Sequence, residues 1–338
     1  MPYRFKLDEN AGKAFRRIAR EQIALALQDL ESDAAPAESI HASRKAIKRL
    51  RALVRAAAPA LGAKPARKHD RALRDVARQL SQRRDSDVTL ETIEKLEAHF
   101  GPSAIDALKS MRAHVAATAP ASQAAVSADG MRDIREALAN EGKRLRKVAL
   151  RGRGMAPVIA GIEQTYRDGR KALKKAFAAP TDESIHELRK TVQAHWRHMA
   201  LLSRCWPDAF AARVNVARDL SQLLGDDHDL AVFKQLAVVV AEPDRIAILD
   251  VCARRQMQLR HEVRYVAVQL YAEKPAMFAD RISIYWSVGR KIARGQEKPP
   301  LESAVLPEGG LSVVPTRIGS QPVLAAKTPG KVRSQPSG

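Results

Sequence analysis

Apolar residues recur at three- and four-residue spacing from about residue 9 to residue 295, and this pattern constrains the fold more than any other feature of the sequence. Only 4% of the residues are aromatic, and no β-branched run bounded by turn residues interrupts the pattern. We therefore predict an all-α protein without a sheet. Helix breaks are expected where proline and glycine interrupt the periodicity. These positions are Pro36, Pro59 to Pro65, Gly101-Pro102, Pro120, Gly152 to Pro157, Pro180, Pro207, Pro243 and Pro275.

The helical region contains two related halves. The segment Glu38-Ser39-Ile40-His41 recurs as Glu183-Ser184-Ile185-His186, and an Arg-Lys pair follows each histidine three and four residues later. Two further segments match in the same order, Asp85-Ser86-Asp87-Val88 and Asp227-His228-Asp229-Leu230. Ordered matches of this kind predict an internal duplication, with a boundary near residues 140 to 155.

The charge of the chain indicates its type of partner. The sequence carries 58 Lys and Arg against 38 Asp and Glu, a formal net charge of +20. An excess this large points to nucleic acid, an acidic membrane surface or another polyanion. Residues 38 to 55 concentrate the charge, with six bases and one acid, and helical spacing places most of these bases on one stripe. The stripe consists of His41, Arg44, Lys48, Arg51 and Arg55, flanked by Lys45 and Arg49.

This basic stripe lies beside the apolar stripe of the same helix rather than opposite to it. Ile40, Ile47, Leu50 and Val54 form the apolar stripe, roughly 110° away around the helix axis. A basic face beside the core can line a groove between helices, whereas one opposite the core is only solvated. Like charges one turn apart also repel each other by roughly a few tenths of a kcal/mol per pair. A bound anion offsets this repulsion, because Arg and Lys donate to phosphate oxygens.

A second and weaker basic helix is predicted after residue 183. Its basic residues are His186, Arg189, Lys190, Arg197 and Arg204, with His198 nearby. Gln193 and Ala194 stand where the first copy has Lys48 and Arg49, so the first copy is expected to bind an anion more tightly. Secondary candidates lie on the two preceding helices and are Arg17, Arg20, Arg167, Arg170 and Lys174.

These motifs resemble the CHAD family, the helical domain named for its histidines. The resemblance rests on His41-x-x-Arg44-Lys45-x-x-Lys48-Arg49-x-Arg51, on the second copy from His186, and on Leu224-Gly225-Asp226-Asp227-His228-Asp229-Leu230. It implies two pseudo-symmetric four-helix bundles, residues 1–148 and 149–296. Residues 297–338 are rich in Pro, Gly and Ser and are expected to form a disordered tail.

The resemblance also implies a function. It implies non-catalytic binding of inorganic polyphosphate in a basic cavity between the bundles, and association with polyphosphate granules in bacteria. The implied ligands are His41, Arg44, Lys45, Lys48, Arg49, Arg51, His186, Arg189 and Lys190, to which the basic stripes add Arg55 and Arg197. Gln193 and Ala194 depart from the basic pattern on their side of the site.

Two other classes of function stay open. A nucleic-acid-binding protein fits the charge, although the basic stripes lack interleaved aromatic residues for base stacking. A phosphate-transferring or hydrolysing enzyme needs a metal or a general base, and the acids around Asp227 and Asp85-x-Asp87 are its candidate. We instead expect these acids to cap a helix start and to pair with Arg83, Arg84 or basic-stripe residues. The prediction is therefore no enzyme, no metal and no cofactor.

The sequence also bears on location. No apolar run of 18 residues occurs, and the N-terminus lacks the apolar segment of a signal peptide, so we expect a cytoplasmic protein without a membrane span. The two cysteines, Cys205 and Cys252, make neither a disulfide framework nor a metal cluster.

Overall fold

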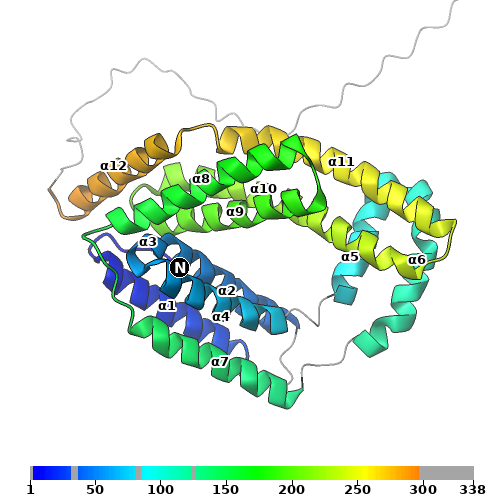
Figure 1. The fold of residues 1–338 in the computed structure, drawn as a ribbon, viewed down its shortest axis with the longest axis horizontal. Coiled ribbons are helices and arrows are strands. Elements are labelled where there is room, and N and C mark those ends of the chain that lie inside the picture. Colours follow the sequence, from blue (N-terminus) through cyan, green and yellow to red (C-terminus); the bar gives the residue numbers. More distant parts are fainter. Residues whose placement is uncertain (1–2, 32–36, 81–84, 123–126, 297–338) are drawn as a thin grey trace, which may run out of the picture. The chain divides into compact units, whose positions relative to one another are not determined.

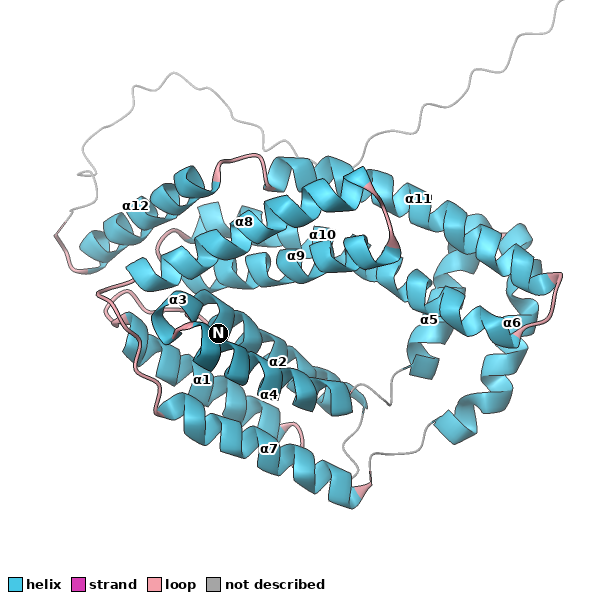
Figure 2. Ribbon diagram, viewed as in Figure 1, coloured by secondary structure: helices cyan, strands magenta, loops and turns pink. Residues whose placement is uncertain are grey.

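The fold is all-α, as predicted. A computed structural model describes residues 3–31, 37–80, 85–122 and 127–296, and within these ranges it contains helices and no strand (Figures 1 and 2). The helices are α1 (Ala11–Gln28), α2 (Ala37–Ala56), α3 (Ala58–Leu61), α4 (Ala63–Gln79), α5 (Asp85–Phe100), α6 (Pro102–Ser122), α7 (Ala128–Arg146), α8 (Ala156–Ala178), α9 (Asp182–Leu202), α10 (Pro207–Leu236), the short 3₁₀ helix η1 (Ala237–Val239), α11 (Asp244–Leu270) and α12 (Pro275–Ala293). The tail predicted for residues 297–338 lies outside the described residues.

Proline marks several of the helix starts that the sequence predicts, but the break predicted at Pro120 is wrong, because α6 continues to Ser122. Helices α6, α10 and α12 begin at Pro102, Pro207 and Pro275, and α8 has Pro157 in its first turn. Proline suits these positions because it lacks the N–H that the first turn leaves unpaired, and because its fixed φ is already helical.

The helices pack in two groups within one compact unit, residues 1–297. In the first group α1 and α4 each contact both α2 and α7. In the second group α8 contacts α9 and α12, and α10 contacts α9 and α11. Helices α5 and α6 belong to the first half of the sequence but pack against α10 and α11 of the second half (Figure 1). The internal duplication and the boundary at residue 148 remain predictions.

Two hydrophobic clusters follow from this packing. The larger one runs through both groups without a break and includes Leu50 of α2 and Tyr166 of α8, both fully or almost fully buried. The smaller one joins α5 and α6 to the far ends of α10 and α11, and includes Ile93 and Phe233. No helix in the described part of the chain is long and apolar enough to cross a membrane.

The two groups lie in close backbone contact where α2 ends. There the backbone of Gly161 on α8 lies against the carbonyl of Ala56, in a space that leaves no room for a side chain. One turn before the end of α2, the buried ring of His198 on α9 donates from Nε2 to the Ala52 carbonyl oxygen at 2.9 Å. These contacts fix α2 against α8 and α9 and thereby set the position of the basic stripe.

Candidate functional site

Two adjoining hollows lie between α2 and α9. The first has a volume of about 400 Å³ and also borders α5 and α10, whereas the second has about 360 Å³ and borders α4. Both are lined by Lys48, Arg51, Lys190 and Gln193, so they form one continuous depression, which we call the basic groove. Its cationic and histidine lining consists of Arg44, Lys48, Arg51, Arg55, Arg74, His186, Arg189, Lys190, Arg197 and His228.

Helix α2 presents its bases to this groove because its apolar stripe is fixed in the core. Ile40, Ile47, Leu50 and Val54 are all buried, as the helical spacing predicts. The basic stripe beside them therefore faces the neighbouring helix α9. The Arg51 side chain also pairs with Asp70 of α4 at 2.8 Å, which holds it along the wall of the second hollow.

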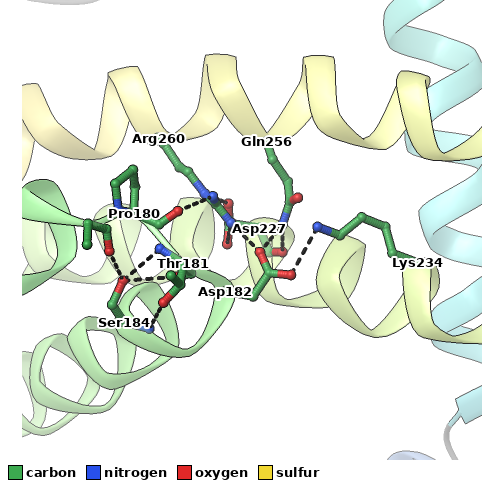
Figure 3. Close-up of polar contacts among 9 residues, drawn as sticks. Pro180, Thr181, Asp182, Ser184, Asp227, Lys234, Gln256 and Arg260 are labelled. Atoms are coloured by element: carbon green, nitrogen blue, oxygen red, sulfur yellow. Dashed lines mark hydrogen bonds and ion pairs between the residues drawn. The ribbon is translucent and has the colours of Figure 1, made fainter.

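Helix α9 is fixed at its first turn. Thr181 and Ser184 form a capping box, in which each side chain accepts a hydrogen bond from the backbone N–H of the other residue. Beside this cap, the Asp182 carboxylate accepts from Arg260 and Gln256 of α11 and pairs with Lys234 of α10 at 3.0 Å (Figure 3). The first turn of α9 is thus bound to two other helices.

Asp227 completes the same network from α10. Its carboxylate accepts from Arg260 Nε at 2.7 Å, and its backbone carbonyl accepts from Gln256 (Figure 3). The prediction that these acids cap a helix start is wrong for Asp227, because it lies well inside α10. Asp227 pairs with Arg260 of α11 instead of a basic-stripe residue, and the other predicted partners, Arg83 and Arg84, lie outside the described residues. The described residues contain no group of three or more His, Cys, Asp or Glu side chains arranged to hold a metal ion.

Positive charge exceeds negative charge in the groove. The acids among the lining residues are Asp70, Glu187 and Asp229, and the first two already pair with Arg51 and Lys190. Arg55 and Arg197 line the second hollow and form no ion pair with any acid of the described chain. Burial lowers the pKa of both, that of Arg197 to about 10. A buried guanidinium without a counterion is costly, so an anion in this hollow relieves the cost.

A histidine pair closes the first hollow. The rings of His186 on α9 and His228 on α10 have their centroids 4.3 Å apart and are inclined at 31°. Burial lowers the pKa of both, and nearby Arg189 and Lys190 lower it further, to about 4 for His228. At neutral pH both rings are therefore uncharged in the protein without a ligand.

The structure places eight of the eleven principal predicted ligands in the groove lining and three outside it. His41 and Lys45 are exposed on α2 and are not among the lining residues. Arg49 points toward the N-terminal segment and α1, where its guanidinium lies 5.6 Å from the Tyr3 ring and 3.4 Å from the Gln22 side-chain oxygen.

The secondary candidates lie elsewhere. Arg17 is held by Glu9 and Glu21, and Arg170 donates to backbone carbonyls at residues 271–273. Arg167, Arg170 and Lys174 border a separate hollow on the outer side of α8. Arg20 and Arg204 are exposed, and His198 is fully buried.

Asp70 and His228 line the groove but were not predicted as ligands, and for Arg74 the sequence left open whether it lines the cavity or is solvated surface. Arg74 and Asp70 come from α4, and only the packing of α4 on α2 brings them to the second hollow. His228 stood in the Asp-rich motif, but only its acidic neighbours were given a role, so it was not predicted as a ligand. Its place beside His186 depends on the packing of α10 on α9, which no local pattern indicates.

Acid is expected to destabilise the protein through His198. Burial is the main cause that lowers the pKa of His198 to about 3, against about 6.5 in the unfolded chain. The folded state therefore resists protonation, and stability that is complete above pH 6.5 is lost as the pH falls toward 3. Between pH 7 and pH 5 this one group costs about 2 kcal/mol. Urea unfolding at both pH values should show a smaller loss in a His198→Gln variant. Equal losses in the two proteins would contradict the assignment.

Comparison with known proteins identifies the family. The family model described as CHAD domain matches residues 13–238. Among solved structures, PptA from Streptomyces chartreusis aligns with a TM-score of 0.55 at 15% identity, covering 78% of this chain and all of that one. The crystal structure of the CHAD domain from the plant Ricinus communis aligns with a TM-score of 0.54 at 18% identity, covering 84% of this chain and 94% of that one. Comparison with curated proteins gives no match. Because the family model covers most of the chain, the protein belongs to the CHAD domain family.

Proposed function

We propose that the protein binds inorganic polyphosphate in the basic groove and does not cleave it. The observation that carries the proposal is the pairing of two basic helix faces, α2 and α9, along one continuous depression. Bases at one-turn intervals, about 5.4 Å apart, match a ligand whose negative charge repeats along its length. The cationic surplus of the groove supplies the attraction, and release of counterions makes the affinity fall steeply with salt, by analogy with nucleic acid.

The lining favours binding over catalysis. Two of its three carboxylates are engaged in ion pairs with Arg51 and Lys190, so they are poor general bases. We also propose that the protein associates with polyphosphate granules in the bacterial cytoplasm, because a granule presents the same polymer at high local concentration.

A composition-matched pair of variants tests the site. Lys48 of α2 and Lys190 of α9 border both hollows, so Lys48→Glu/Lys190→Glu makes the net charge of the groove more negative by four units. This variant is expected to bind long-chain polyphosphate at least about tenfold more weakly, since each lost charged contact is worth about 1.5–3 kcal/mol. The control, Lys64→Glu/Lys68→Glu, makes the same substitutions on the exposed side of α4. Equal affinities of the two variants would show that the groove is not the site.

The same titration separates the competing functions. Nucleic acid supplied at the same phosphate concentration and ionic strength should displace polyphosphate poorly, because the groove offers cations but no row of exposed aromatic rings. Release of inorganic phosphate after addition of Mg²⁺ would identify an enzyme instead of a binding protein.

A further inference from the structure

We propose that occupation of the basic groove by a phosphate polymer is coupled to uptake of one proton by the adjacent histidine pair His186–His228, so that the groove binds more tightly as the pH falls. The inference rests on the proposed function and adds a regulatory property to that site. Three observations support it: the two rings lie in the wall of the groove, basic residues surround them, and their centroids are 4.3 Å apart.

The two rings form part of the wall against which a ligand would lie. Both line the first hollow, together with Arg44 and Lys48 of α2 on the opposite side. The Nδ1 atom of His186 is buried and has no hydrogen-bond partner in the described structure. No acceptor of the described structure therefore stabilises a proton on that nitrogen. Because the nitrogen is buried, an anion in the groove would favour the charged ring through its electric field and not by a hydrogen bond to Nδ1.

The protein groups that face the pair keep it neutral. The bases around the pair are Arg44, Lys48 and Arg51 of α2, Arg189 and Lys190 of α9, Lys234 of α10 and Arg260 of α11. The acids are Asp182 and Glu187 of α9 and Asp227 and Asp229 of α10. The acids Asp182, Glu187 and Asp227 are each paired with a base. The described lining side chains of α5 are Val88, Thr89 and Thr92, which are uncharged.

A bound phosphate chain reverses this balance. Its negative oxygens offset the field of Arg189 and Lys190 and favour the imidazolium form, so the pKa of the pair is higher in the complex than in the free protein. Because the ring centroids are 4.3 Å apart, two imidazolium charges would repel each other, and the pair takes up one proton rather than two.

The sign of the pH dependence follows from this difference. Whenever the complex holds more protons than the free protein, affinity rises as the pH falls through the pKa of the complex. The rise ends near the pKa of the free pair, which is about 4 for His228. For one proton the limiting slope is a tenfold gain in affinity per pH unit. The interior phosphates of a long polymer stay ionised over this range, so the ligand contributes no slope of its own.

The experiment measures the affinity of the full chain for long-chain polyphosphate between about pH 8 and pH 5.5 at constant ionic strength. We expect affinity to increase as the pH falls, with a slope that approaches tenfold per pH unit. Calorimetry in two buffers with different heats of ionisation should show uptake of close to one proton at the acidic end. This second readout uses the unaltered protein, so it remains informative if a variant fails to fold.

A double variant, His186→Gln/His228→Gln, is expected to lose this slope and the proton uptake. The matched control His114→Gln/His261→Gln changes two histidines on α6 and α11 that do not border the basic groove, and it should keep both. A pH-independent affinity of the unaltered protein, or a slope that survives in the double variant, would overturn the inference. Absence of binding at every pH would instead overturn the proposed function itself.

Discussion

A Gly161→Ala variant is expected to lose about 1–2 kcal/mol of unfolding free energy, although alanine is the better helix former. A Cβ atom at this position would lie 2.0 Å from the Ala56 carbonyl oxygen and 2.7 Å from its carbon. Both are backbone atoms at the end of α2, so they cannot rotate away as a flexible side chain would. Overpacking of this kind costs about 1–3 kcal/mol and occasionally more, against a gain in helix propensity of at most about 1 kcal/mol.

The control is Gly12→Ala, in the first turn of α1. The atoms closest to its added methyl group are polar side-chain atoms at 3.6 Å, which is an ordinary contact distance. This variant is expected to be neutral, or more stable by about 0.5–1 kcal/mol. Urea unfolding followed by circular dichroism measures both. A Gly161→Ala protein as stable as the Gly12→Ala protein would show that α2 and α8 are not packed this closely.

The position of Gly161 illustrates what the sequence could not provide. The periodicity of α8 identifies a helix, and its apolar residues identify a buried face, but nothing local indicates that the end of α2 lies against it. Close backbone contacts between helices far apart in the chain are a property of the packed molecule. The same reason explains why the packing of α5 and α6 on α10 and α11 was not predicted.

The candidate site could also be predicted only in part: the sequence indicated which residues share a helix face, but not which helices face each other. Arg44, Lys48, Arg51 and Arg55 of the predicted stripe line the groove together, because helical geometry fixes which residues share a face, whereas His41 of the same stripe is exposed outside it. Arg49 follows Lys48 directly and is therefore rotated by about 100° around α2, toward α1 and Tyr3. The repeated histidine motif indicated that α2 and α9 are related helices. No local sequence pattern indicates that α2 and α9 face each other across one groove, because this arrangement follows from the tertiary packing.

Replacing Arg260 by methionine is expected to be the most damaging single change near the site, with a loss of about 3–5 kcal/mol. Arg260 binds the Asp227 and Asp182 carboxylates together, and the Asp227 side chain is only 1% exposed. Burial already raises the pKa of Asp227, and the hydrogen bonds from Arg260 partly counteract this rise. Without the guanidinium, a buried carboxylate is left without its ion-pair partner, which costs more than the pair itself contributes.

A double-mutant cycle separates loss of the pair from loss of packing. In Asp227→Asn/Arg260→Met the buried charge is removed together with its partner, so a large part of the lost stability should return. Arg260→Lys keeps the charge but not the fork that reaches both carboxylates, and should fall between the single variant and the unaltered protein. Because Asp182 sits one turn before His186, loosening this network should also weaken polyphosphate binding in Arg260→Met more than in the double variant. A double variant no more stable than Arg260→Met would show that the network stabilises α9 through packing and not through charge pairing.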